Sequence, residues 1–390
     1  MKVLITDGEY PHTLGIIRSL GVKKIEVNVV STKKRCISFY SKFSKKKIIS
    51  PVSPYFEKGY IEFIKKVLKE EKYDVLIPVG FQTTKIISKN RNKLEKFVKL
   101  EVADYETINL AMDKSKTYEL AKKLGISYPK TIYPQTFKEV ENLSYYLDFP
   151  VVIKGLYEAG KQVISYPNNR DEFITDYHIL CEENGFKEGS LPMVQEYIGK
   201  GGNECLAALY QNGKVKRFVV YKAIRCFPIK GGASSCATTF YDKEIVEKGT
   251  KLLNALNWHG VADVEFKRDK KNGKLKLMEI NPKFYATVEV AIRAGMNFPY
   301  YLCQMAAGND LEFSNYYERN LIYNYPFSKE LIHLKENPSS IFHFIIDTVN
   351  QKVKSNIWLI DFKANIFELA TTIASFLPKK TKQLLKYYLK

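Results

Sequence analysis

Cysteine and histidine are scarce in this chain, and neither is arranged as a metal site or a catalytic pair. The 390 residues include six cysteines, with no Cys-x-x-Cys spacing and no companion histidine at metal-ligand spacing. A reduced, cytosolic protein is the simplest interpretation. With five histidines, we find no Ser/His/Asp or Cys/His set for nucleophilic catalysis. We expect His12 and His259 to be structural or solvated, with substrate contact as the alternative.

Long apolar runs are also missing. The chain begins with the strand-like segment 3–6 rather than a charged and apolar leader, so no signal peptide is predicted. The most apolar stretch near the C-terminus, 357–377, is interrupted by Asp361, Lys363 and Glu368, which argues against a membrane span. The sequence therefore predicts a soluble, cytoplasmic protein.

Two nucleotide-related signatures are absent. No Gly-x-Gly-x-x-Gly follows the first predicted strand, so a dinucleotide is not expected in the N-terminal part. No basic motif is interleaved with aromatic residues, so nucleic acid is not an expected partner.

Acidic residues are few relative to basic ones, and the formal net charge is +19. Such an excess fits an anionic ligand, an anionic membrane surface or nucleic acid, and charge alone does not choose among them. Part of the excess lies in two runs without acids, 33–47 and 379–390. Most runs of this kind are ordinary solvated faces.

The chain has ample material for a large core, because 45% of its residues are hydrophobic and 13% are aromatic. In residues 1–108, short apolar runs alternate with helical patterns, which predicts βαβ units and a parallel sheet. The loops 7–10 and 80–83 follow two of these strands, where an open α/β sheet usually meets its ligands.

A second unit begins near residue 109. Asp113 is expected to cap a helix that Gly125 ends. Buried strands are predicted over 149–155, ending in a lysine and a glycine, and over 193–198. Strands over 205–210 and 214–221 flank an Asn-Gly hairpin turn at 212–213.

The segment from 313 onward lacks residues that suggest chemistry, and it is expected to be a helical extension. One predicted helix carries its apolar residues on a single stripe, at 362, 366, 369, 370, 373 and 376. Most often such a stripe packs on the body of the protein. The alternative, given the lysines that follow, is contact with an acidic membrane surface.

The most informative feature is a pair of predicted strands that carry carboxylates, at 263–266 and 278–282. Side chains alternate along a strand, so Asp263 and Glu265 share one face, as do Glu279 and Asn281. Hard oxygen donors of this kind suit Mg²⁺ that also binds nucleotide phosphates. An isolated surface hairpin with solvated acids is the alternative, but the apolar neighbours favour strands in a core, where carboxylates need a cation or many donors.

These strands complete an ordered set of motifs at 113–114, 150–155, 195–198, 204, 231–235, 263–266 and 279–282. The set resembles the ATP-grasp superfamily of carboxylate-amine ligases over roughly residues 1–312. The resemblance implies an α/β and α+β architecture: a Rossmann-like domain (1–108), an ATP-grasp domain with a lid lobe (about 109–190) and a metal-binding lobe (about 191–312), and the helical extension (313–390).

The resemblance also implies roles for individual residues in binding ATP and Mg²⁺, with Mn²⁺ as a substitute. Lys114 and Lys154 resemble the lysines that reach the nucleotide phosphates, with a surface lysine as the alternative reading for each. Glu204 would accept from the ribose and is otherwise a solvated loop glutamate. Gly155 follows the strand lysine, the adenine hinge corresponds to Gln195, Glu196, Tyr197 and Ile198, and the metal ligands correspond to Glu265, Glu279 and Asn281.

Arg225 is expected to steady the transferring phosphoryl group, and Lys222 competes for that role. Asp263 is expected to be an outer acceptor rather than a ligand. Two departures from the family are apparent. The loop 155–161 has only Gly155 and Gly160, which implies a looser lid. Lys283 stands where many members have arginine, without its forked geometry.

The function implied is ATP-dependent formation of an amide or peptide-like bond through an acyl-phosphate, from a small-molecule carboxylate and an amine. Conjugation of amino acids to cell-surface polysaccharide and ligation of two amino acids are both open. The rival class is a non-catalytic ATP-binding module docked on an acidic surface. A homo-oligomer, and a peripheral position at the inner membrane face through the basic C-terminus, are also open.

Overall fold

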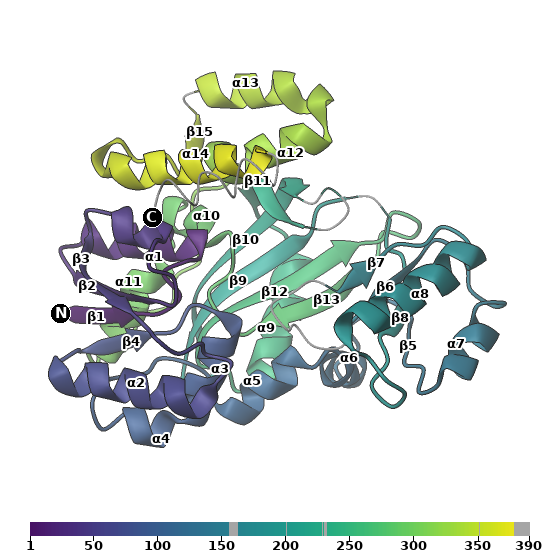
Figure 1. Ribbon diagram of the computed structural model, residues 1–390, viewed down its shortest axis with the longest axis horizontal. Coiled ribbons are helices and arrows are strands. Elements are labelled where there is room, and N and C mark those ends of the chain that lie inside the picture. The colour runs from purple at the N-terminus through teal and green to yellow at the C-terminus, as the bar shows by residue number, and fades with distance from the viewer. Residues whose placement is uncertain (156–162, 200, 228, 230–231, 351, 378–390) are drawn as a thin grey trace.

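The computed structural model describes residues 1–155, 163–199, 201–227, 229, 232–350 and 352–377. Three sheets organise the chain (Figure 1). The mixed α/β architecture expected from the sequence is confirmed.

The N-terminal sheet is parallel and has the order β3-β2-β1-β4. Its strands are β1 (Lys2–Ile5), β2 (Glu26–Ser31), β3 (Ser44–Ile49) and β4 (Val75–Ile77). The helices around it are α1 (Pro11–Gly21), α2 (Glu57–Glu70), α3 (Phe81–Lys89), α4 (Arg91–Leu94) and α5 (Tyr105–Met112). The predicted alternation of strands and helices is confirmed.

The loops after β1 and β4 meet at the carboxyl edge of this sheet. The buried Asp7 carboxylate accepts hydrogen bonds from the Gly80 amide at 2.7 Å and the Thr83 hydroxyl at 2.6 Å. These bonds join the two loops that the sequence singled out.

A small antiparallel sheet lies at the far end of the molecule, with the order β5-β8-β6-β7 (Figure 1). Its strands are β5 (Thr131–Ile132), β6 (Val151–Lys154), β7 (Ile164–Ser165) and β8 (Met193–Glu196), covered by α7 (Phe137–Leu143) and α8 (Arg170–Asn184). Helix α6 (Lys114–Lys123) leads into it, and the predicted cap is present, because Asp113 accepts from the amides of Ser115 and Lys116.

The large sheet has the order β13-β12-β9-β10-β11-β14-β15. Its strands are β9 (Glu204–Gln211), β10 (Lys214–Phe227), β11 (Ala233–Phe240), β12 (Gly260–Arg268), β13 (Leu275–Asn281), β14 (Ile322–Asn324) and β15 (Val353–Ser355). Strands β9 and β10 form the predicted hairpin, and both turn residues, Asn212 and Gly213, have positive φ.

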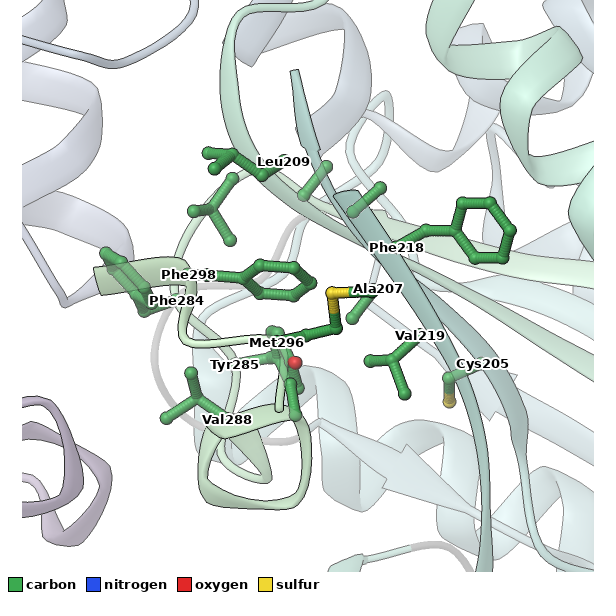
Figure 2. Packing of buried hydrophobic residues seen from close by; sticks show 14 of the residues in the cluster. Cys205, Ala207, Leu209, Phe218, Val219, Phe284, Tyr285, Val288, Met296 and Phe298 are labelled. Atoms are coloured by element: carbon green, nitrogen blue, oxygen red, sulfur yellow. The ribbon is translucent and has the colours of Figure 1, made fainter. Parts of the chain in front are cut away.

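Helices α9 (Lys243–Ala255), α10 (Val288–Arg293) and α11 (Phe298–Ala306) accompany the large sheet. Figure 2 shows Leu209 and Val219 of the central strands close to Met296, Phe298 and Val288, from the segment that follows β13. The main hydrophobic core runs from this layer into the N-terminal domain, because Val3, Ile5 and Ile17 belong to the same cluster. The large sheet and the N-terminal domain thus share one hydrophobic core.

The observed elements suggest small changes to the domain borders expected from the sequence. Residue 108 lies inside α5, and β8 belongs to the small sheet although it follows residue 190. We therefore propose borders after Met112 and after Glu196, and keep the third at 312.

The C-terminal extension contains the expected helices and two strands that the sequence did not predict. Strands β14 and β15 continue the large sheet. The helical elements among the described residues are η2 (Pro326–Glu330), α12 (Leu331–Glu336), η3 (Pro338–Ser340), α13 (Ile341–Val349), η4 (Leu359–Asp361) and α14 (Phe362–Phe376). Figure 1 shows α13 and α14 as the outermost layer, with α14 lying over α1. Among the described residues, no helix is both long and apolar enough to cross a bilayer.

Helix α14 packs with the opposite face from the one that its sequence favours. Its buried residues are Ala364, Asn365, Glu368 and Thr372, whereas Phe362, Ile366 and Ile373 are exposed. The expectation that the apolar stripe packs on the body is therefore corrected. The reason lies beneath the helix, where a buried charge of α1 needs polar partners.

That charge is Arg18, which is fully buried. Its guanidinium donates to the Asp361 carboxylate at 2.8 Å, to the Asn356 carbonyl at 2.7 Å and to the Asn365 side chain at 2.7 Å. All three acceptors belong to the extension. A buried cation needs such partners, so Arg18 joins the N-terminal domain to the C-terminal layer.

We predict that Arg18→Met destabilises the protein strongly, because Asp361 would stay buried without its charge partner. Breaking a buried pair typically costs about 3 to 5 kcal/mol, and a urea titration should show a loss of that size. Lys66→Met is the matched control, since the Lys66–Glu70 pair spans 3.7 Å on an exposed surface and should change the unfolding free energy by less than about 1 kcal/mol. Equal losses in the two variants would contradict the role of Arg18.

Candidate active site

Strands β12 and β13 bring the predicted metal ligands to one face of the large sheet. They are antiparallel neighbours, with Asp263 opposite Asn281 and Glu265 opposite Glu279. Directly opposed residues share a face, and residues two apart on a strand do so as well. The Asn281 amide donates to Glu265 at 2.9 Å, which is consistent with this arrangement. The structure therefore brings the three side chains together.

Two lysine ammonium groups reach Glu279 from different elements. Lys114, at the start of α6, and Lys154, at the end of β6, lie 3.3 and 3.4 Å from the same Glu279 oxygen. Burial by itself would raise the pKa of Glu279, but the two cations outweigh it and lower the pKa to about 2. The carboxylate is thus ionised, and it links the lid lobe to the metal-binding lobe.

Glu265 is held by two amides. Besides Asn281, the side chain of Asn203 donates to it at 2.6 Å. Behind them, Asp263 is fully buried and accepts from the Tyr221 hydroxyl at 3.1 Å and from Asn281 at 3.4 Å. Asp263 thus orients Asn281, which agrees with its expected place as an outer acceptor.

The donor set fits a hard divalent cation that also binds phosphate. Mg²⁺ usually takes only a few protein oxygens and leaves its other positions to water and nucleotide oxygens. Glu265, Glu279 and the Asn281 amide offer such a partial set. Within the described ranges, no three His, Cys, Asp or Glu side chains gather as a self-sufficient metal site.

The segment expected to bind adenine, 195–198, consists of the last two residues of β8 and the two residues that follow it. The Gln195 side chain is used internally, because it donates to the Tyr118 hydroxyl at 3.1 Å and to Thr131 at 3.0 Å. The Glu196 amide donates to the Lys130 carbonyl at 2.9 Å, and its carboxylate pairs with Lys276. Glu196 thus joins the lid lobe to β13, and the backbone of Tyr197 and Ile198 is left as the candidate for the base edge.

Glu204, the expected ribose acceptor, lies at the start of β9. Its carboxylate binds Arg268 at 3.1 Å, and Arg268 also pairs with Asp242 and Glu244 at 2.9 Å each. The ribose role stays a prediction, and it would require Glu204 to share its oxygens with this guanidinium.

The register places Lys222 away from the metal ligands. Lys222 pairs with Glu204, and Glu204 pairs with Phe266. Phe266 is the neighbour of Glu265, so Lys222 lies on the opposite face of the sheet from Glu265. Its ammonium group lies 5.1 Å from the ring of Phe240. Contact between Lys222 and a transferring phosphoryl group stays a prediction, and it would require the side chain to act from the other face of the sheet.

The Arg225 guanidinium is held by two carboxylates of the C-terminal extension. It binds Glu330 of η2 at 2.8 Å and Asp347 of α13 at 2.5 Å. Contact with a transferring phosphoryl group stays a prediction, because Arg225 would have to exchange at least one of these partners to make it.

Lys283 follows Asn281 in the loop after β13. It lines a small pocket with Leu76 and Pro78 of the N-terminal domain. Its charge and that of Lys329 add to the effect of burial, which lowers the pKa of His12 well below its usual value. Lys283 therefore lies between the metal ligands and the N-terminal domain, and His12 is expected to be neutral.

Two expected loops are only partly covered. Gly155 donates its amide to the Val163 carbonyl at 3.0 Å, whereas 156–162, including Gly160 and Lys161, lies outside the described residues. Gly231 also lies outside them, and Gly232 directly precedes β11. The expectation of a looser lid stays a prediction. His259 is structural, as expected, since it bonds Glu101 at 2.7 Å.

The sequence analysis missed two residues of this region. Asn203 holds Glu265, but an asparagine in a glycine-rich loop gives no signal by itself. Lys267 lies 5.7 Å from the ring of Tyr197, and its pKa is lowered because of burial and, to a lesser extent, the nearby Lys154. Its position in an apolar strand beside Glu265 was the available signal.

We predict that Glu279→Gln lowers stability near neutral pH. A carboxyl whose pKa falls from its usual 4.5 to about 2 on folding contributes stability that is complete above about pH 5 and is lost as pH falls toward 2. The variant should lose about 1 to 3 kcal/mol at pH 7, and the difference should shrink in acid.

Chemical denaturation between pH 7 and pH 3 measures this effect. Glu70→Gln is the control, because Glu70 is exposed and pairs weakly with Lys66 at 3.7 Å. A Glu279→Gln loss that does not depend on pH would contradict the assignment of the two lysines as the cause.

Comparisons with known proteins agree with this geometry. A family model described as "ATP-grasp in the biosynthetic pathway with Ter operon" matches residues 210–325. The carbamoyl phosphate synthase large chain of Thermoanaerobacter sp. (strain X514) is 26% identical over 271 residues, which cover 67% of this chain and 24% of the relative. The counterpart in Myxococcus xanthus is 24% identical, with 71% and 26% covered. The chain thus spans about a quarter of these relatives.

Solved structures share the fold at low identity. The biotin carboxylase domain of 2-oxoglutarate carboxylase from Hydrogenobacter thermophilus, in complex with MgADP, ADP and bicarbonate, gives a TM-score of 0.66 at 18% identity, covering 82% of this chain and 73% of that one. An L-amino acid ligase from Bacillus licheniformis gives 0.63 at 16%, covering 82% and 78%.

N5-carboxyaminoimidazole synthetase from Staphylococcus aureus gives a TM-score of 0.62 at 16% identity, covering 82% of this chain and 80% of that one. The matches agree with the ordered motifs and with the lysines and carboxylates that meet between two lobes. Residues 210–325 therefore match an ATP-grasp family model, and the fold of the chain is similar to that of the solved structures named above.

Proposed function

We propose that the protein is an ATP-dependent carbon-nitrogen ligase. A substrate carboxylate would attack the γ-phosphorus of ATP and release ADP, leaving an acyl-phosphate. An amine would then attack the acyl carbon, releasing phosphate, losing a proton and forming an amide. The observation that carries the proposal is the meeting of Lys114, Lys154 and Glu279 beside Glu265 and Asn281.

The residues of the chain would act mainly by positioning charge. Lys114 and Lys154 carry compact charges on flexible side chains, which suit phosphate oxygens, and a polyphosphate arriving there would compete with Glu279 for them. Glu265, Glu279 and Asn281 would then hold Mg²⁺, with Mn²⁺ as an expected substitute. When bound, the ion supplies charge neutralisation at the β- and γ-phosphates.

The substrates follow from weaker support. Lys283 lies where the loop after the metal ligands meets the N-terminal domain, and we propose that it binds the carboxylate or acyl-phosphate as a point charge. The likeness to an L-amino acid ligase supports amino acids as one substrate class. Amino-acid conjugation in cell-surface polysaccharide pathways is the second class that we propose to test. A cytoplasmic location and a homo-oligomer stay predictions.

An ADP-release screen over pairs of carboxylates and amines with Mg²⁺ tests the reaction. A productive pair should give a product whose mass equals the two substrates minus water. A protein that binds ATP but releases no ADP with any pair would favour the non-catalytic module.

We predict that Glu279→Gln lowers ADP release with a productive pair by at least about a hundredfold, because loss of one fixed charge at a transferring phosphoryl group has a cost of that order. Glu70→Gln is the matched control and should retain full activity. Comparing the near-UV and far-UV circular dichroism of the two variants separates lost chemistry from lost fold. Unchanged turnover in Glu279→Gln would contradict the proposal that Glu279 is a metal ligand.

A further inference from the structure

The outer layer of the C-terminal extension presents apolar side chains to solvent. Helix α13 has no buried residue. Its apolar side chains Phe342, Ile346 and Val349 are 73%, 59% and 74% exposed. The turn before α14 adds Leu359 at 86%. Scattered apolar residues on a surface need no explanation, but a group on neighbouring elements of one layer indicates an interaction site.

Helix α14 shows that this exposure is built into the fold. Its inward face is polar, because Asn365 and Glu368 bond Arg18 and Asn356. Its outward face carries Phe362, Ile366 and Ile373, which are 56%, 60% and 51% exposed. A helix whose polar face is taken by the protein has its apolar face available for an apolar partner.

Basic residues border the same layer. Within the described residues of 326–377, the exposed charges are Lys335, Lys352, Lys354 and Lys363 against Glu336. The other acids, Glu330, Asp347, Asp361 and Glu368, are bonded inside the protein. The sequence then continues into 379–390, which contains five lysines and no acid.

The basic run near the N-terminus, 33–47, lies beside α14. Residues 33–47 surround the short helix η1 (Ile37–Tyr40), which packs on α14 through the stacked rings of Tyr40 and Phe367. The amide of Lys42 donates to Asp361 at 2.8 Å. Lys42, Lys45, Lys46 and Lys47 are all exposed. The basic run 33–47, distant in the sequence, thus lies beside the helix that carries the exposed apolar residues.

We propose that this layer, formed by α13, the turn 359–361 and α14, docks on the surface of an anionic lipid bilayer. Apolar side chains entering the interface and lysines beside anionic headgroups are the two contributions that hold amphipathic helices on such membranes. A second copy of the chain fits less well. In a two-fold contact the same surface of both copies meets, so the lysines of one copy would lie close to those of the other and repel them. Docking does not depend on the ligase activity proposed above.

Sedimentation of the full-length protein with vesicles tests the docking. Vesicles of phosphatidylcholine with about one third phosphatidylglycerol should bind the protein at least about tenfold more tightly than phosphatidylcholine alone, and high salt should weaken that binding. Binding equal on the two vesicle types, or absent from both, would overturn the proposal.

Ile366→Asp/Ile373→Asp should lower binding to anionic vesicles by at least about tenfold, because two charges would enter the interface. Ile179→Asp is the matched control: Ile179 is 47% exposed on α8 of the lid lobe, at the opposite end of the molecule (Figure 1), and binding should not change. Lys363→Glu leaves the apolar face intact and should weaken binding severalfold.

Because the substituted side chains are exposed, we expect each variant to have a melting temperature near that of the parent protein. Light scattering after gel filtration tests the alternative partner of this surface, a second copy of the chain. A dimer that Ile366→Asp/Ile373→Asp converts to monomer would overturn lipid docking in favour of a second copy, and full vesicle binding by that variant would overturn the surface itself.

Discussion

The placement of Glu279 between Lys114 and Lys154 is the interaction on which the site depends. Three elements supply these side chains, since Lys114 begins α6, Lys154 ends β6 and Glu279 lies in β13. A buried carboxylate is costly unless it is paired, and the two ammonium groups would repel each other without it. The Glu279 carboxylate thus joins the two lobes and holds both lysines close together. In the proposed function, polyphosphate oxygens would take the place of the Glu279 oxygen beside these lysines.

Much of the fold was readable from the sequence, because its signals are local. Alternating apolar runs gave the parallel N-terminal sheet, Asp113 gave the start of α6, and Asn212-Gly213 gave the hairpin of β9 and β10. The convergence of Glu265, Glu279 and Asn281 was predictable for the same reason, since it needs only two neighbouring strands and the alternation of side chains.

The rest depends on partners far away in the sequence. Arg225 donates hydrogen bonds to Glu330 and Asp347, which are 105 and 122 residues away. No sequence pattern near Arg225 predicts these partners. Lys222 and Glu204 share a sheet with the metal ligands but lie on its other face, which only the register of three strands reveals. The side chains of Gln195 and Glu196 bind other residues of the protein. The motif located these two residues but did not indicate which of their atoms could contact a ligand.

The inverted packing of α14 follows from a single buried charge. Arg18 sits on α1 at the surface that α14 covers, and its guanidinium requires several acceptors when water is removed. Asn365 and Glu368 lie three residues apart on one face of the helix, and Ile366 and Ile373 lie seven apart on another, so burying the first pair leaves the second pair exposed. The sequence shows the stripe but not its direction, because hydrophobic periodicity identifies an apolar face without identifying what lies against it. Charge pairs hold this layer together with apolar contacts: Arg18 joins it to the N-terminal domain and Arg225 joins it to strand β10, while Phe367 stacks on Tyr40. The apolar surface that a helix normally uses for its own packing is thereby left for an external partner.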